Sequence, residues 1–333
     1  MAKRKLTNQQ SRRVKKRRVL QQKTEMPGVA VSGEQLDGLV ITNFGKKVLV
    51  EGSDGERYTC FVRQHLGKLV AGDHVIWQKD LEPGTGIINQ VLERQTLLSR
   101  PGFRGEIRMI AANITQIGVV SPIIPGIHPD MIDRYLIASE QIGIDAFIIL
   151  NKVDLVEEEE HWDAIGAVML PYHKMGIPIV LTSCVKEHGL DDLQRQLGGE
   201  TSVLVGPSGA GKSSLIKTLI PDLEIRIGEL SAATGLGSHT TSNSILYHLP
   251  AGGDLIDSPG VRLFSPQPCS LSELERYYPD FEPFLGQCRF NNCSHTHEPG
   301  CAIVEAIEKG KIADQRLHSF HRLLREFDQS KQD

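Results

Sequence analysis

Three short motifs in this 333-residue chain bring together residue types that bind nucleotides. Residues 151–154 are "NKVD", residues 206–213 are "GPSGAGKS" and residues 257–260 are "DSPG". The second motif matches a glycine-rich phosphate loop, and the other two resemble a base-recognition loop and a phosphate-sensing loop. Each follows an apolar stretch, and ligands collect at the ends of such strands in open α/β sheets. Together the motifs predict a guanine nucleotide site.

The phosphate loop supplies both backbone and side-chain groups. Its glycines allow several N–H groups to turn inward around phosphate oxygens. Lys212 adds positive charge for the β- and γ-phosphates, and the Ser213 hydroxyl is placed to ligate Mg²⁺. The loop predicted to bind the nucleotide consists of Gly206, Pro207, Ser208, Gly209, Ala210, Gly211, Lys212, Ser213 and Ser214.

Asp154 is the residue expected to select guanine. Its carboxylate can accept two hydrogen bonds, from the ring N–H and the amino group of guanine, whereas adenine would leave it unpaired and desolvated. Lys152 is expected to pack along the base and Asn151 to brace the loop. Ser183 and Cys184, in "TSC", are expected to lie behind the base and to offer backbone N–H groups to the guanine oxygen. Asp154 thus argues against an ATP-dependent phosphate-loop enzyme.

The remaining nucleotide contacts are expected from the last motif. Asp257 can hold Mg²⁺ through water, and the Gly260 amide can meet the γ-phosphate. The order of the motifs is unusual, because the base-recognition loop precedes the phosphate loop. Joining the two ends of this order and cutting it at one other point restores the usual order. Such a change is possible because chain ends in compact domains often lie close together. A circularly permuted domain is therefore predicted, in which the segment after residue 260 leads directly into the next module.

Two types of element pattern precede the C-terminal region. Between about 110 and 265, near-continuous Val/Ile/Leu runs alternate with helical stretches, which predicts a mostly parallel sheet covered on both faces. Between about 36 and 95, five short β-rich runs fit a small closed barrel of the oligonucleotide-binding kind. Four residues there are candidates for stacking on bases: Tyr58, Phe61, Arg63 and Trp77. Phe61 and Trp77 could equally fill the barrel, and for any single aromatic the core role is favoured.

Charge is distributed unevenly along the chain. Residues 1–23 contain ten Lys or Arg and no Asp or Glu; removing those ten charges from a net charge of −4 leaves −14 for the remainder. Such an arm is a candidate nucleic-acid tether, with a solvated tail as the plain alternative and a mitochondrial presequence as a weaker one. The N-terminus lacks the apolar core of a secretory signal, and no apolar run is long enough to span a bilayer.

A metal site is predicted near the C-terminus. Cys288, Cys293, His295 and Cys301 have the spacing C-x₄-C-x-H-x₅-C, and three thiolates with one imidazole form a closed set typical of structural zinc. His297 is a rival for the fourth position. Four ligands leave no open position for catalysis, so the ion is expected to stabilise the fold of a region with a small core.

These motifs together resemble the circularly permuted, small-ribosomal-subunit-dependent GTPases of the RsgA (YjeQ) type. "NKVD", "GPSGAGKSS", "GSHTTS", "DSPGVR" and "CRFNNCSHTHEPGC" stand where that family has its motifs, and the likeness covers nearly the whole chain. The resemblance favours His295 as the fourth ligand of one structural Zn²⁺. It implies a cytoplasmic bacterial GTPase that uses Mg²⁺ with GTP. It also implies binding to the small subunit and its rRNA during late maturation, with hydrolysis when bound there.

The expected architecture is α/β and has four parts. These are a basic disordered arm over residues 1–35, an OB-fold RNA-binding barrel over 36–100, a circularly permuted P-loop GTPase domain over 101–268 and an α-helical zinc-binding domain over 269–333. A monomer suffices for this plan, and no membrane partner is expected.

Some residues depart from common forms of the motifs. Cys184 and Ser258 are conservative changes, but Val261 stands where Ras-like enzymes have a glutamine that orients water. Valine cannot polarise water, so slow intrinsic hydrolysis is expected. His239 is the candidate for positioning the nucleophile, the alternative being an exposed loop residue; either Thr240 or Thr241 would complete the Mg²⁺ shell. Val261 also keeps open a nucleotide-gated RNA-binding scaffold whose hydrolysis has no role in its cycle.

Overall fold

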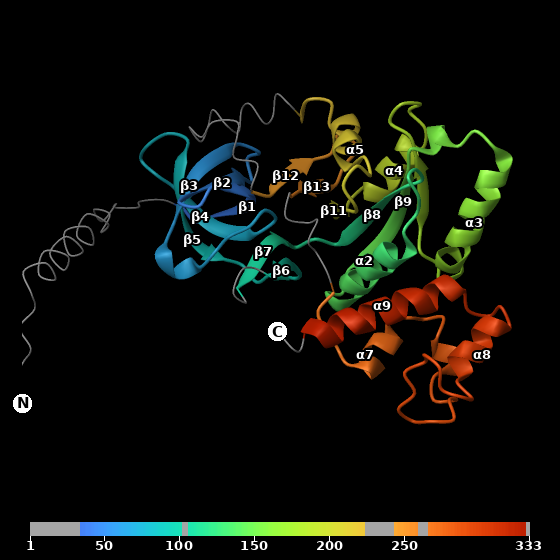
Figure 1. Cartoon of the computed structure of the whole chain (residues 1–333). Helices are drawn as coiled ribbons and strands as arrows, with labels where there is room; N and C mark the ends of the chain where they lie inside the picture. The colour runs from blue at the N-terminus through green and yellow to red at the C-terminus, as the bar shows by residue number, and fades with distance from the viewer. Residues whose placement is uncertain (1–33, 102–105, 224–242, 259–265, 331–333) are drawn as a thin grey trace, which may run out of the picture.

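The computed structural model describes residues 34–101, 106–223, 243–258 and 266–330 of the chain. The basic arm predicted over residues 1–35 therefore lies almost wholly outside the described residues. Figure 1 shows a small β structure at the start of the described chain, an α/β layer in the middle and a group of helices at the end. This order is the one that the sequence predicts.

Five strands close into a barrel. They follow the order β1-β2-β3-β5-β4, and β1 also pairs with β4 to complete the ring. Trp77 is fully buried inside, and a Cβ added at Gly38 or Gly86 would lie 2.7 or 2.6 Å from its indole ring. The core interpretation is therefore correct for Trp77, whereas Tyr58 and Phe61 are half-buried and Arg63 is exposed. The strands are β1 (Leu36–Asn43), β2 (Lys47–Gly52), β3 (Arg57–Val62), β4 (His74–Lys79) and β5 (Thr85–Val91).

The α/β layer is the predicted parallel sheet. Its strands follow the order β10-β9-β8-β11-β13-β12, and all are parallel except β12. Every residue of β8 is buried, as expected of a strand covered on both faces. The strands are β8 (Gln116–Pro122), β9 (Asp145–Asn151), β10 (Ile179–Thr182), β11 (Thr201–Val205), β12 (Ile245–His248) and β13 (Asp254–Asp257).

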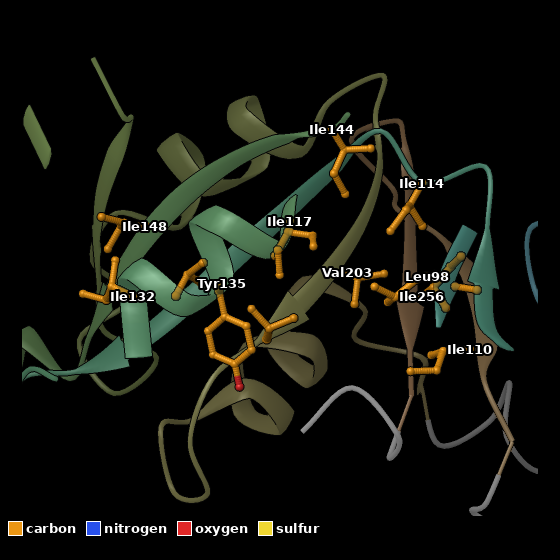
Figure 2. Packing of buried hydrophobic residues seen from close by; sticks show 14 of the residues in the cluster. Leu98, Ile110, Ile114, Ile117, Ile132, Tyr135, Ile144, Ile148, Val203 and Ile256 are labelled. Atoms are coloured by element: carbon orange, nitrogen blue, oxygen red, sulfur yellow. The ribbon is translucent and has the colours of Figure 1, made fainter. Parts of the chain in front are cut away.

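Helices cover both faces of this sheet. One apolar cluster packs α2 (Pro129–Gln141) and α3 (Glu159–Lys174) on one face, and a second packs α4 (Leu190–Leu197) and α5 (Lys212–Leu219) on the other. Figure 2 shows Tyr135 and Ile132 of α2 beside apolar residues of the sheet. Pro129 at the first helical position and Asp130 in the first turn favour the start of α2.

The hairpin of β6 (Leu97–Pro101) and β7 (Ile107–Ala112) joins the barrel to the sheet and spans the predicted domain limit at residue 100. Leu98 and Ile110 of this hairpin share an apolar cluster with Ile256 of the sheet and Ile41 of the barrel. A tight contact supports the joint, because a Cβ added at Gly72 would lie 2.1 Å from the Ala112 carbonyl oxygen. The barrel is therefore packed against the sheet.

β12 connects the two β structures directly. It pairs antiparallel with β1 of the barrel at Thr42 and Ile245, so that one eleven-stranded sheet runs through both. His248 at the end of β12 contacts both sides: its Nδ1 lies 2.6 Å from Asp254 Oδ1 and its Nε2 lies 2.8 Å from Glu51 Oε1 on β2. The sequence pattern predicts neither β12 nor this bridge.

The C-terminal helices pack on α2. They are α7 (Leu271–Arg276), α8 (Ala302–Glu308) and α9 (Asp314–Ser330), with Gly310 between the last two. Ile137 of α2 belongs to their apolar cluster. Buried Arg316 of α9 pairs with buried Asp133 of α2 and with Asp280, whose Oδ1 lies 3.0 Å from Arg316 Nη2. Within the described chain, no helix is both long and apolar enough to cross a membrane.

Candidate functional site

The predicted nucleotide motifs follow strands that end at one edge of the sheet. The parallel strands β9, β10, β11 and β13 end at Asn151, Thr182, Val205 and Asp257. Because neighbouring parallel strands run in the same direction, their carboxyl ends lie together, which is where open α/β sheets bind ligands. The fold thus brings together loops that lie far apart in sequence.

The phosphate loop connects β11 to α5 in a tight turn. Gly206 is buried with φ 140°, and a Cβ there would lie 2.2 Å from the Val120 carbonyl oxygen, so only glycine fits. The Lys212 ammonium donates hydrogen bonds of 2.7 Å to the carbonyl oxygens of Gly206 and Pro207 and so lies across the loop. Ser213 and Ser214 are exposed in the first turn of α5, and the N-terminus of a helix favours an anion.

Asn151 links the base-recognition loop to the phosphate loop. Its Nδ2 donates a 2.8 Å hydrogen bond to the Ala210 carbonyl oxygen, and both residues are buried. A Cβ added at Gly211, whose φ is 97°, would lie 2.2 Å from the same nitrogen. The two loops are therefore in direct contact despite their reversed order in the chain.

Asp154 lies beside the loop that is expected to back the base. The Ser183 hydroxyl donates a 2.5 Å hydrogen bond to Asp154 Oδ1, which fixes the orientation of the half-buried carboxylate. Lys152 takes a left-handed conformation with φ 68° at the turn between β9 and the 3₁₀ turn Val153–Leu155. Cys184 is half-buried directly after Ser183. The protein thereby holds the Asp154 carboxylate in place beside the "TSC" loop.

The phosphate-sensing motif is described only in part. Asp257 is exposed at the end of β13, and Ser258 follows it. Gly260 and Val261 lie outside the described residues, as do the predicted catalytic residue His239 and the two alternative Mg²⁺ ligands Thr240 and Thr241. Their roles stay predictions.

Two contacts near the phosphate loop are absent from the sequence prediction. Buried Thr182 donates a 3.1 Å hydrogen bond to Asn151 Oδ1 and so orients the amide that contacts Ala210. Burial raises the pKa of Tyr135 on α2, and a hydrogen bond from the Gly206 backbone opposes that shift. Thr182 is the first residue of the "TSC" stretch that is expected behind the base, but the sequence does not indicate its contact with Asn151. Nothing in the sequence marks Tyr135.

The predicted metal ligands gather at the far end of the molecule. The ligand atoms of Cys288, Cys293, His295 and Cys301 all lie within 4.8 Å of one another. His295 Nδ1 lies 3.6 Å from Cys288 Sγ and 3.3 Å from Cys301 Sγ, and these two sulfurs are 4.0 Å apart. A tetrahedral ion with zinc–sulfur distances near 2.3 Å requires ligand separations of about 3.8 Å. The four residues therefore fit a structural zinc ion, whereas His297 is exposed and outside the group.

Surrounding groups orient this donor set. His295 is buried, and its Nε2 lies 3.0 Å from Glu275 Oε1 on α7, which leaves Nδ1 facing the sulfurs. Burial raises the pKa of the Cys293 thiol to about 12 and also raises that of Cys301. Thiolates here therefore need a cation to compensate their charge, as zinc does.

Comparisons with known proteins agree over most of the chain. The family model described as RsgA GTPase matches residues 91–267. A "Small ribosomal subunit biogenesis GTPase RsgA" from Pseudomonas aeruginosa strain UCBPP-PA14 is 42% identical over 334 residues, which cover 97% of this chain and 98% of that protein. A protein of the same name from Photorhabdus laumondii is 40% identical and covers 99% of this chain and 97% of its own length.

Two solved structures are similar to the whole arrangement. The crystal structure of YjeQ from Thermotoga maritima superimposes with a TM-score of 0.70 and 30% identity, covering 88% of this chain and 99% of that one. YloQ, whose structure is described as a circularly permuted GTPase, has a TM-score of 0.69 and 24% identity, covering 92% and 99%. The predicted permuted fold is therefore confirmed.

Proposed function

This chain belongs to the RsgA GTPase family, and we propose on that premise that it hydrolyses GTP while bound to the small ribosomal subunit, during late maturation of that subunit. The names of its relatives support the GTPase activity and the role in small-subunit biogenesis. Stimulation of hydrolysis by the subunit is the finer part of the proposal. The proposal also includes a cytoplasmic location and a monomeric state of the protein.

One contact carries the assignment of the nucleotide site. The 2.8 Å hydrogen bond from Asn151 Nδ2 to the Ala210 carbonyl oxygen holds the base-recognition loop against the phosphate loop. Asp154, fixed by Ser183, then selects guanine within reach of the loop that binds the phosphates. A reversed motif order with separated loops would have argued against any shared site.

The residues divide the work of hydrolysis as follows. Magnesium bound with GTP neutralises charge on the β- and γ-phosphates. Backbone groups of residues 206–214 hold the phosphates, Lys212 turns from its carbonyl partners towards them, and Ser213 and Asp257 hold the metal directly and through water. Gly260 and one of Thr240 and Thr241 respond to the γ-phosphate. His239 orients the attacking water, because Val261 cannot.

The other modules provide binding to RNA and a stable structure. We assign rRNA binding to the barrel of residues 36–100 and to the basic arm of residues 1–35, whose positive charge would release counterions from RNA. Residues 101–268 form the GTPase domain. Residues 269–333 form the zinc domain, with one structural ion on Cys288, Cys293, His295 and Cys301. That domain follows the phosphate-sensing loop directly in the chain. A change of that loop with the bound nucleotide would therefore be passed along the chain to the position of the zinc domain.

The decisive test is GTP turnover titrated with purified small subunits, beside large subunits as the control. We expect stimulation by orders of magnitude with small subunits and little with large ones. Equal turnover with both would reject the proposed activation and favour a nucleotide-gated scaffold. His239→Ala should lower stimulated turnover and leave GTP affinity nearly unchanged; unaltered stimulated turnover would remove His239 from the mechanism. Displacement of labelled GTP by ATP at similar concentration would reject guanine selection by Asp154.

A further inference from the structure

The turn between the first two cysteines of the metal group presents an aromatic ring to solvent. Arg289, Phe290, Asn291 and Asn292 are consecutive exposed residues between Cys288 and Cys293, and we call them the knuckle turn. Phe290 keeps 42% of its surface exposed. It lies outside the apolar cluster that holds the C-terminal helices together. Neither the nucleotide site nor the metal group uses this ring.

The knuckle turn is held in shape by backbone contacts. The Cys293 N–H donates to the Phe290 carbonyl oxygen at 3.2 Å, which closes the turn, and the Arg289 N–H donates to the Gly300 carbonyl oxygen at 3.0 Å. The residues beneath it, Cys293 and Cys301, are buried. The backbone that carries the ring is therefore held in place before any ligand arrives, which lowers the entropy cost of binding.

The side chains of the knuckle turn match the chemistry of an unpaired nucleotide. The Arg289 guanidinium lies 5.6 Å from the centre of the Phe290 ring, in a cation–π arrangement that places positive charge beside an aromatic face. Bases stack on such rings, arginine binds phosphates, and side-chain amides pair with base edges. We propose that the knuckle turn binds one unpaired RNA nucleotide, with the base stacked on Phe290; this inference rests on the proposed action at the small ribosomal subunit.

The surroundings favour RNA over an apolar protein partner. Within the described residues 266–330, Phe290 is the only exposed large apolar side chain, and a single ring is too small for a stable protein interface. Trp162 on α3 offers a contrast. It is 37% exposed but follows the acidic run Glu157–Glu160 and precedes Asp163, which repel phosphates. The knuckle turn itself contains no carboxylate.

Binding of a single-stranded RNA oligonucleotide and of small subunits to the wild type and four variants tests the site. Removing one stacked base contact should weaken binding on the order of tenfold, so we expect this loss for Phe290→Ala. Trp162→Ala, which removes an equally exposed aromatic from an acidic surface, should bind as the wild type does. Phe290→Trp should retain or increase affinity. Phe290→Leu keeps apolar area without a π-face, and full binding by this variant would overturn stacking.

Fluorescence reports stacking directly. A protein with both Trp162→Phe and Phe290→Trp has two tryptophans. The new one, at position 290, is exposed, and Trp77 is buried in the barrel. Single-stranded RNA should quench the new indole, and duplex RNA of the same length should not. Unchanged emission at saturating single-stranded RNA would overturn the proposal.

Two controls separate the possible failures. Equal zinc content and thermal unfolding of Phe290→Ala and wild type show that the domain is intact, which we expect because the ring is exposed. If the wild type itself shows no affinity for small subunits, the proposed function fails. If the wild type binds and Phe290→Ala binds equally well, only the knuckle turn is rejected.

Discussion

The nucleotide edge of the sheet and the metal group are both proposed to hold a charged ligand on short loops, but they are built in opposite ways. Asn151 and Ala210, or Asp154 and Ser183, come from loops that only the folded sheet brings together. The metal ligands come from residues 288–301 alone, beside a small cluster of helices. The first site therefore depends on the fold around it, whereas we expect the fold around the second to depend on its ligand.

This difference explains why the motif order could change at one site and not at the other. A pocket made at the ends of parallel strands keeps its geometry when the strands are connected in a new order, because packing between strands and helices positions the loops. A site within a single stretch has no such freedom, since the spacing of its ligands is the site.

Removing zinc should have the largest effect. Structural zinc contributes on the order of 10 kcal/mol or more to the folding of small metal-dependent domains, so chelation should unfold residues 269–330. The sheet has its own cores and should keep GTP affinity. Far-ultraviolet circular dichroism and nucleotide titration, with and without chelator, measure the two responses. Loss of both together would show that the sites do not differ as described.

Replacing Arg316 with methionine should have the next largest effect. Asp133 is fully buried and would lose its charged partner, which costs about 3–5 kcal/mol of stability in comparable cases. Arg322→Met is the matched control: this side chain is 59% exposed, and its pair with Asp130 should contribute less than about 1 kcal/mol. Urea unfolding of the zinc-loaded proteins measures both. Equal losses would mean that the buried pair does not hold the helices on α2.

Asp154→Asn should weaken GTP binding roughly 100-fold, because the new amide group faces the donors of guanine instead of accepting from them. Xanthosine triphosphate has a carbonyl oxygen in place of the amino group of guanine and can accept a hydrogen bond from that amide. Its affinity should therefore fall far less than that of GTP, or rise. Isothermal titration with both nucleotides checks the change of preference. An equal loss for both would mean that Asp154 supports the loop without contacting the base.

The smallest effect concerns His248, which bridges β12 and the barrel. Its hydrogen bonds to Asp254 and Glu51 raise its pKa to about 9 from an ordinary value of 6.5. Because the folded pKa is the higher one, this stabilisation is complete below pH 6.5 and is lost as the pH rises through 9. The His248 side chain is 41% exposed, so solvent screening reduces its contribution to the free energy of unfolding to about 1 kcal/mol.

His248→Gln should remove that pH dependence and leave stability at pH 10 nearly unchanged. Thermal unfolding of both proteins between pH 6 and 10 measures it. Parallel pH profiles for the two proteins would show that the bridge carries no charge-dependent stability.

The sequence predicted the residues whose chemistry is local. Residue type and spacing indicate the phosphate-loop glycines, the metal ligands and the apolar strands. Five short alternating runs indicate the barrel. Long-range pairs left no such signal. Arg316 and Asp133 are 183 residues apart, and each is unremarkable by itself. The same holds for Tyr135 beside Gly206 and for the four-residue strand β12, because contacts between distant residues follow from packing and not from any local pattern.

The pairing of β1 with β12 has a consequence for dividing the molecule. β12 is the last strand of the α/β layer, and the barrel occupies its outer side at Thr42. A fragment that begins after the barrel would expose unpaired N–H and C=O groups along that strand, together with apolar side chains such as Ile256 and Leu246 that share a cluster with Ile41. Bare strand edges recruit other chains and aggregate. The barrel thus also covers a strand edge of the α/β layer that would otherwise promote aggregation.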